Sequence, residues 1–237
     1  MSERSGSRGV LGRLRDAVCR VREDVAAIRD RDPAAGGTLD VLLFYPGMTA
    51  VWTHRVAHAL WRRNRRFGAR ALSHLVRLLT AVEIHPGAEL GRRVTIDHGA
   101  GVVVGETAEL GDDVHLYHGV TLGANRPQPG KRHPTVEANV VLGANSTVVG
   151  SVTVGERAVV GAGAVVTDDV PAGATMVGNP AERVDGVRAV ADDGEGGAVG
   201  GAATADADGT DVGGADADGA GVDDDADSAS RAPFRCS

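Results

Sequence analysis

A six-residue repeat is the feature that most constrains how this chain can fold. Aliphatic or small residues recur with a step of six, first over residues 84–120 and again over residues 136–172. This pattern predicts a left-handed parallel β-helix, in which each hexapeptide forms one flat side and three hexapeptides complete a triangular coil. The repeat positions give about five coils, and they are Ile84, Leu90, Ile96, Val102, Ala108, Val114, Val120, Val136, Leu142, Val148, Val154, Val160, Val166 and Ala172.

The composition agrees with a tightly coiled chain of small side chains. Glycine occurs 34 times, and aromatic residues make up only 3% of the chain. Glycine accepts the positive φ angles that sharp corners require. A barrel or sandwich would instead show alternating strands separated by turns every 8–12 residues or so.

The regions on either side of the repeat have different patterns. Residues 8–30 carry an amphipathic helical stripe, a short apolar run over 39–45 stops at Pro46, and residues 48–64 and 68–81 favour two more helices. We therefore expect an α+β fold with three parts. These are an N-terminal helical domain (1–82), a left-handed β-helix domain (83–187) and a disordered acidic tail rich in Gly, Ala and Asp (188–237).

The net negative charge of the chain comes from the tail. Residues 191–237 hold twelve acidic residues and two arginines, whereas the whole chain has a net charge of −7. The remainder is close to neutral and has no basic footprint for nucleic acid. Two isolated cysteines, no signal peptide and no long apolar segment favour a cytoplasmic protein without a membrane span.

Candidate chemistry lies where the repeat is interrupted or carries outward polar groups. About ten extra residues end in Arg132 and His133, and we expect this loop to extend away from the wall toward a neighbouring chain. His98 follows Asp97, just after an inward Ile96, and should point outward. Glu83 lies 15 residues earlier, close to one coil, so its carboxylate could orient the imidazole of His98 as a general base.

Alternative interpretations remain for these histidines. The chain has eight histidines, and most of them are expected to be ordinary surface or hydrogen-bonded residues. His115 and His118 also raise the possibility of a zinc site like that of the γ-class carbonic anhydrases, which use the same fold. A scaffold without catalytic activity is a further alternative.

Several motifs together resemble the serine O-acetyltransferases of the hexapeptide-repeat acyltransferase superfamily. The resemblance covers about residues 30–187. It rests on "RDP" at 31–33, "EIHPGA" at 83–88, "IDHGAGVVVGET" at 96–107, "VTLGANRPQPGKRHP" at 120–134 and "GNPAERV" at 178–184.

The resemblance implies a reaction in which acetyl passes from acetyl-CoA directly to the hydroxyl of L-serine, giving O-acetylserine for cysteine biosynthesis, with no metal. It also implies a role for each matching residue. The expected catalytic residues are His98 as general base, Glu83 as its orienting acid, and His133. The expected substrate-binding residues are Asp32 and Asp97 for the ammonium group and Arg132 for the carboxylate. The expected acetyl-CoA contacts are Gly123, Ala124, Ala144 and Ala162.

The resemblance further implies assembly. We expect a homotrimer with each active site between two chains. A hexamer remains possible, although the chain begins about sixty residues later than long family members. The final "APFRCS" lacks the isoleucine with which relatives dock into cysteine synthase, which argues against that partner. The alternative activity is acyl transfer to another small hydroxyl or amine acceptor.

Overall fold

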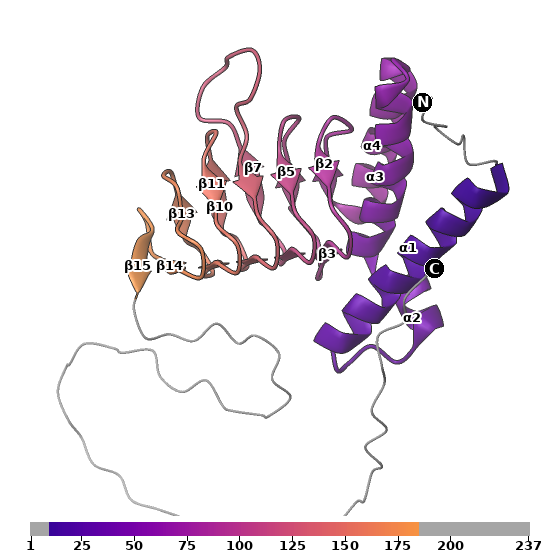
Figure 1. Cartoon of the computed structure of the whole chain (residues 1–237), viewed down its shortest axis with the longest axis horizontal. Coiled ribbons are helices and arrows are strands. Elements are labelled where there is room, and N and C mark those ends of the chain that lie inside the picture. Colours follow the sequence, from indigo (N-terminus) through magenta and orange to yellow (C-terminus); the bar gives the residue numbers. More distant parts are fainter. Residues whose placement is uncertain (1–9, 185–237) are drawn as a thin grey trace, which may run out of the picture. The chain divides into compact units, whose positions relative to one another are not determined.

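A computed structural model describes residues 10–184 of the chain. Its N-terminal part is helical, as the amphipathic pattern predicts (Figure 1). The short apolar run before Pro46 also forms a helix, and Pro46 opens the next one, where its missing N–H costs nothing. The helices are α1 (Val10–Arg31), α2 (Thr38–Phe44), α3 (Pro46–Arg62) and α4 (Arg66–Thr80).

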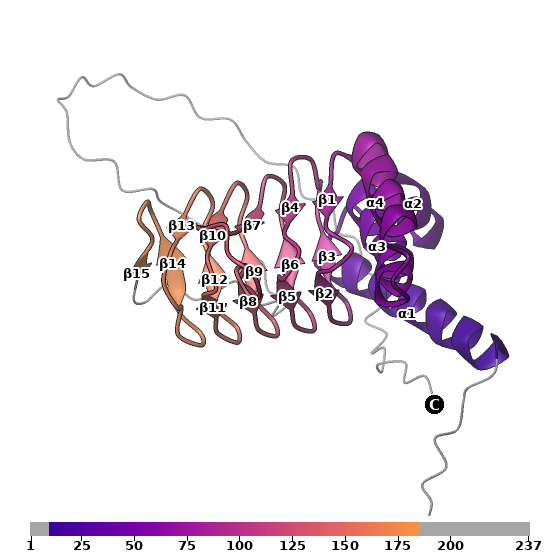
Figure 2. The same cartoon turned by 90° about the horizontal axis from the view of Figure 1, so that it is seen from above.

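The repeat region forms fifteen short strands that wind into a left-handed parallel β-helix. Successive strands belong to different walls, so each wall collects every third strand (Figure 2). The strands are β1 (Glu83–Ile84), β2 (Glu89–Leu90), β3 (Thr95–Ile96), β4 (Val103–Val104), β5 (Glu109–Leu110), β6 (His115–Leu116), β7 (Thr121–Gly123), β8 (Thr135–Val136), β9 (Val141–Leu142), β10 (Thr147–Val149), β11 (Thr153–Val154), β12 (Val159–Val160), β13 (Val165–Val166), β14 (Thr175–Val177) and β15 (Glu182–Val184).

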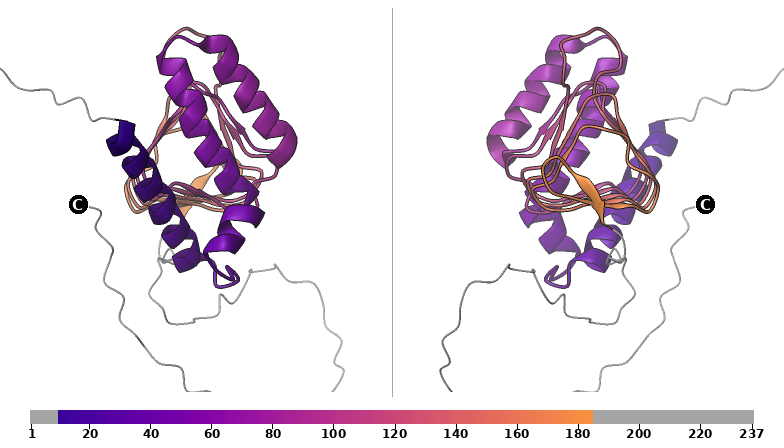
Figure 3. Two further views of the ribbon diagram at one scale, coloured as in Figure 1. Left: turned by 90° about the vertical axis from the view of Figure 1, so that its right-hand side faces the viewer. Right: turned by 90° about the vertical axis from the view of Figure 1, so that its left-hand side faces the viewer.

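Three sheets form the walls of the triangular coil (Figure 3). The first sheet has the order β1-β4-β7-β10-β13, the second β2-β5-β8-β11, and the third β3-β6-β9-β12-β14-β15. Neighbouring strands are parallel except for β14 and β15, which close the third sheet with an antiparallel pair. The predicted fold class and the five coils are confirmed.

The step of six is not continuous, contrary to our expectation. Ile96 on β3 is followed by Val104 on β4 after eight residues, and the register pairs Thr95 with His115 twenty residues later. Most repeats bury two residues, one in the strand and one at the preceding corner. The repeat positions read from the sequence are strand residues up to Ile96 but corner residues from Val102 to Val120. This change from strand to corner kept the step at six and hid a two-residue insertion beside Asp97 and His98. At the end of the repeat, Ala172 is exposed rather than inward.

Three edges join the walls, and each has its own polar groups. The edge between the third and first sheets, called the His98 edge, contains residues 97–102, 117–120, 143–146 and 161–164. The edge between the first and second sheets, the His133 edge, contains residues 85–88, 105–108 and 124–134. The edge between the second and third sheets, the α1 edge, contains residues 91–94 and 111–114.

The helices pack against the first coil at very close range. A Cβ at Gly47, in the first turn of α3, would lie 2.1 Å from the carbonyl oxygen of Ile96, so only glycine fits there. α1 is held to α3 by Asp24, which is fully buried and pairs with Arg55 while accepting a hydrogen bond from Trp52. The backbone before Asp97 and His98 is therefore fixed against the helical part.

Residues 10–184 contain no helix that is long and apolar enough to cross a membrane. Helices and coils belong to one unit by their contacts, and the expected boundary at residue 82 stays a prediction. The predicted disordered tail, 188–237, lies outside the described residues.

Buried neutral histidines should make stability depend on pH. Burial lowers the pKa of His115 to about 4 and that of His54 to about 3, whereas an unfolded histidine titrates near 6.5. The unfolded chain therefore binds more protons below pH ~6.5, and the free energy of unfolding should fall as the pH drops from about 6.5 to about 4. Urea unfolding at fixed protein concentration measures this loss. His115→Gln should flatten the slope, whereas His74→Gln, at an exposed site on α4, should not. An equal slope in His115→Gln and the parent protein would contradict the prediction.

Candidate active site

The His98 edge presents an exposed imidazole beside a carboxylate. His98 occupies the two-residue insertion and has a φ of 59°, a left-handed conformation that costs a non-glycine residue about 1 kcal/mol. This conformation leaves its side chain 75% exposed, with Nε2 3.6 Å from Oδ2 of Asp97. The corner thus projects a base and an acid outward from the wall.

Asp32, from the loop after α1, belongs to the same cluster. Its carboxylate accepts hydrogen bonds from the hydroxyl of Tyr45 and from the backbone N–H of Ala34 at 2.8 Å. These two bonds, followed by the smaller effect of His98, hold the pKa of Asp32 below its usual value. Burial, and then the charges of Asp32, Asp40 and Asp97, raise the pKa of Tyr45. The two expected ammonium ligands, Asp32 and Asp97, therefore both lie near His98.

The same edge continues along successive coils through small residues. Asn145 N–H donates to the carbonyl of His118, and Gly163 N–H donates to the carbonyl of Ala144, both at 2.8 Å. These bonds stack His118, Ala144 and Ala162 in that order, consistent with the expected eighteen-residue separation of the two alanines. The His118 ring lies edge-on to that of His98, with centroids 6.1 Å apart.

The His133 edge holds the interrupting loop by means of the Gly-Glu-Thr motif. The hydroxyl oxygen of Thr107 accepts the backbone N–H groups of Arg132 and His133 at 3.0 and 3.2 Å. Glu106 pairs with the guanidinium of Arg132, which keeps the pKa of Glu106 low. At Gly105, a Cβ would lie 2.0 Å from Cδ2 of His133, so the absent side chain makes room for the imidazole.

His133 is only 8% exposed, because its ring folds back onto this wall. Figure 1 shows the loop extending beyond the neighbouring turns at β7, yet its Arg-His end returns to Thr107. We expected His133 to reach outward from the wall, but in the single chain its side chain is buried against the wall. The Gly-Glu-Thr motif fixes the place of the ring instead.

The contacts of His133 determine which nitrogen carries its proton. The backbone N–H of Thr107 donates to Nδ1 at 3.2 Å, and an amide can only donate. The neutral ring must therefore carry its proton on Nε2. Burial, followed by the charge of Arg132, lowers the pKa of His133, which favours this neutral form. His133 is thus set up as a hydrogen-bond donor through Nε2 rather than as a base.

The remaining predicted residues lie on or near the first sheet. Gly123 ends β7 and Ala124 begins the loop on the His133 edge. Glu83, on β1, is paired with Arg77 of α4 at 3.0 Å. Among the described contacts, none joins Glu83 to His98. The first coil of twenty residues places Glu83 beside Val103, five residues beyond His98 in the sequence.

One chain therefore carries the predicted site in two halves. Asp32, Asp97 and His98 gather on one edge, and Arg132 and His133 gather on another, with the first sheet between them. Within residues 10–184, no group of three or more His, Cys, Asp or Glu side chains is placed to hold a metal ion. His115 is buried against Thr95 and is not close to a zinc-binding set.

Sequence reasoning did not find Tyr45, Thr107 or the ring contact of His118 with His98. Thr107 could have been found, because it ends a Gly-Glu-Thr motif already singled out. Tyr45 carries no comparable signal, since its importance depends on how α2 and α3 bring it back to Asp32.

Replacing Thr107 should release the loop and change the titration of His133. Thr107→Val leaves two backbone N–H groups without their acceptor and admits water around the ring, so the pKa of His133 should rise toward 6.5 or so. Nitrogen NMR of the imidazole measures both the pKa and the tautomer. Thr167→Val, at an exposed site three coils further along the same edge, is the matched control. An unaltered His133 titration in Thr107→Val would show that the hydroxyl does not hold the ring.

Comparisons with known proteins find relatives by sequence and by fold. Residues 4–53 match the family described as "Serine acetyltransferase, N-terminal", and residues 135–168 match the "Hexapeptide repeat of succinyl-transferase". Among solved structures, serine acetyltransferase of Neisseria gonorrhoeae in complex with serine has a TM-score of 0.69 and 37% identity, over 73% of each chain. A soybean serine acetyltransferase complexed with serine has a TM-score of 0.69 and 46% identity, over 71% of this chain and 69% of that one.

Curated relatives are more similar still. The serine acetyltransferase of Mycobacterium tuberculosis is 54% identical over 164 residues, covering 69% of this chain and 72% of the relative. That of Helicobacter pylori is 52% identical over 157 residues, covering 66% of this chain and 92% of the relative. On this sequence similarity and on the shared fold, the chain belongs to the serine acetyltransferase family.

Proposed function

We propose that the chain transfers acetyl from acetyl-CoA to the hydroxyl of L-serine at a site formed where the His98 edge of one subunit meets the His133 edge of another. The observation that carries this proposal is the convergence of Asp32, Asp97 and His98 on one corner. Similarity to relatives solved with serine supports the choice of acceptor.

Serine needs recognition at both ends and a base at its hydroxyl. Asp32 and Asp97 offer two carboxylates to the ammonium group. Arg132 offers a planar guanidinium fork to the carboxylate, and it must share or exchange its present partner Glu106 to do so. The two ends are thus bound by groups from different edges, which is why the proposed site requires two subunits.

Direct transfer requires no acyl-enzyme. His98 removes the proton from the serine hydroxyl while that oxygen attacks the thioester carbonyl. The new C–O bond forms, the C–S bond breaks, and the departing thiolate takes the proton from the imidazolium. The backbone N–H groups around Gly123 and Ala124, with Nε2–H of His133, are suited to donate to oxygens at this centre.

Acetyl-CoA is expected to lie along the His98 edge. Ala144 and Ala162 leave this edge without large side chains, so the pantetheine arm can approach the backbone closely. The proposed contact joins two unlike surfaces, the His98 edge of one subunit and the His133 edge of the next. Contacts of this kind close into a ring when the rotation between subunits is threefold, so a homotrimer pairs all three His98 edges with His133 edges. The same rotation repeats the site three times.

The activity is tested by CoA release from acetyl-CoA in the presence of L-serine. His98→Asn should lower kcat by about a thousandfold, the usual contribution of a general base. His74→Asn, which alters an exposed histidine on α4, should have normal activity. Circular dichroism checks that both variants are folded.

Homoserine, sugars and amino sugars are offered in parallel with serine. Faster CoA release with one of these acceptors would favour acyl transfer to another small hydroxyl or amine. Normal turnover by His98→Asn would contradict the proposed mechanism even if serine is the acceptor.

A further inference from the structure

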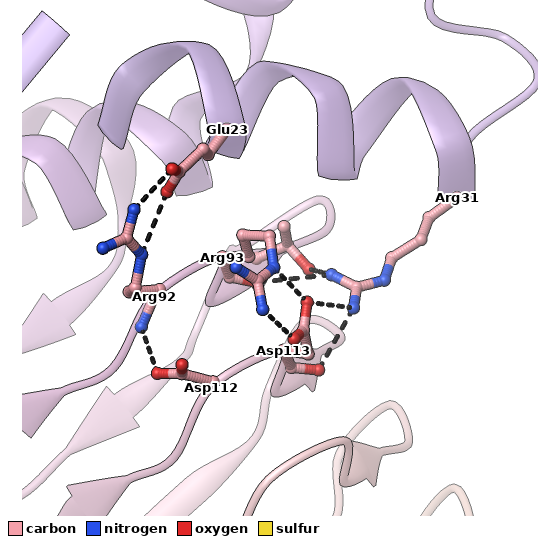
Figure 4. A network of polar contacts seen from close by, with 7 residues as sticks. Glu23, Arg31, Arg92, Arg93, Asp112 and Asp113 are labelled. Atoms are coloured by element: carbon pink, nitrogen blue, oxygen red, sulfur yellow. Dashed lines mark hydrogen bonds and ion pairs between the residues drawn. The ribbon is translucent and has the colours of Figure 1, made fainter. Parts of the chain in front are cut away.

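A network of charged residues joins α1 to the α1 edge of the first two coils (Figure 4). Arg92 pairs with Glu23 of α1, and Arg93 forms a two-point pair with Asp113 in the next coil. The backbone N–H of Arg92 also donates to Asp112 at 2.7 Å. The network thus ties a helix to two successive turns of the β-helix.

Arg31, the last residue of α1, also belongs to this network. Its Nη1 donates to the hydroxyl oxygen of Thr95 at 2.9 Å, and its Nη2 donates to the carbonyl oxygen of Asp113 at 3.1 Å. The same Nη2 is 3.7 Å from the Asp113 carboxylate. Thr95 is completely buried, so the guanidinium reaches a fixed point of the wall rather than a mobile surface group.

Thr95 also contacts a histidine in the next coil. Its Oγ1 lies 2.7 Å from Nδ1 of His115, which burial keeps neutral at ordinary pH by lowering its pKa to about 4. Because the oxygen accepts from Arg31, its hydroxyl proton is available for Nδ1. The order Arg31, Thr95, His115 therefore forms a continuous chain of hydrogen bonds from helix to second coil.

Two short covalent connections link this chain to the proposed serine site. Asp32 directly follows Arg31, and Asp97 lies two residues after Thr95 on the strand that leads to His98. Asp32 and Asp97 belong to separate elements, and their carboxylates must keep a fixed separation to hold one ammonium group. A bond between their near neighbours is a direct way to fix that separation.

We infer that Arg31 is a positioning residue, which sets the distance between Asp32 and Asp97 through its bond to Thr95 and thereby determines recognition of the substrate ammonium. This inference rests on the proposed function. Arg31 acts on binding of the acceptor and has no part in the chemistry of the thioester.

Arg92 offers a matched control on the same edge. Its pair with Glu23 also ties α1 to the first coil, but Glu23 is eight residues, about two helical turns, before Arg31. The Arg92 side chain is 45% exposed, compared with 26% for Arg31. Loss of the Arg92 pair removes an attachment of the helix without touching the residues next to Asp32 or Asp97.

Steady-state kinetics of Arg31→Gln, Thr95→Val and Arg92→Gln test the inference. The first two variants should raise KM for serine roughly ten- to hundredfold, the scale of a small misplacement in an active site. Their KM for acetyl-CoA and their kcat should stay close to the parent values, because the base and the thioester contacts are elsewhere. Arg92→Gln should leave all three parameters unchanged.

A double variant separates positioning from general destabilisation. If Arg31 works through Asp32, Arg31→Gln combined with Asp32→Asn should have the same KM for serine as Asp32→Asn alone. Additive increases would overturn the inference, as would a normal serine KM in Arg31→Gln. If Arg31→Gln does not fold, Thr95→Val decides, since it keeps the shape of the threonine. Absence of serine acetylation in the parent protein would instead refute the proposed function.

Discussion

Inward stacking of aliphatic side chains determines where every other feature of this fold can lie. Most repeats bury one residue in the strand and one at the corner, and copies from successive coils lie on each other in the core. The walls therefore cannot be altered without opening the core. Polar groups with a chemical role are confined to edges and to insertions at edges. His98 lies in a two-residue insertion, and His133 ends a longer one.

Each of the three edges holds a different part of the structure. The α1 edge holds the helical part through ion pairs, and the Gly47 contact with Ile96 seats α3 on the first coil. The loop that follows α1 then carries Asp32 close to His98. The His133 edge holds its loop with Thr107 and Glu106. Because the first sheet separates the His98 and His133 edges, a second subunit is the simplest means to unite their residues at one substrate.

The sequence predicted the β-helix, its five coils and most helix bounds, since these follow from periodic burial. It also predicted that His98 points outward from the wall, because His98 lies two residues after the inward Ile96. It missed the insertion beside His98, because buried corner residues such as Val102 kept the same step of six as the strand residues. It placed Glu83 next to His98 by counting eighteen residues per coil, whereas the first coil has twenty. The hydrogen bonds of Tyr45, Thr107 and Arg31 depend on tertiary approach, which no local pattern records.

In the proposed trimer, one site needs the His98 edge of one chain and the His133 edge of another. Mixing two inactive variants is the sharpest test. His98→Ala and His133→Ala chains are unfolded together, refolded as mixed assemblies and assayed for CoA release with serine. In an equal mixture of randomly assorted chains, about a quarter of the interfaces should carry both histidines, so activity should return to about a quarter of the parent rate. If the mixed assemblies form but stay as inactive as either variant alone, the two histidines do not meet across subunits and the account is wrong.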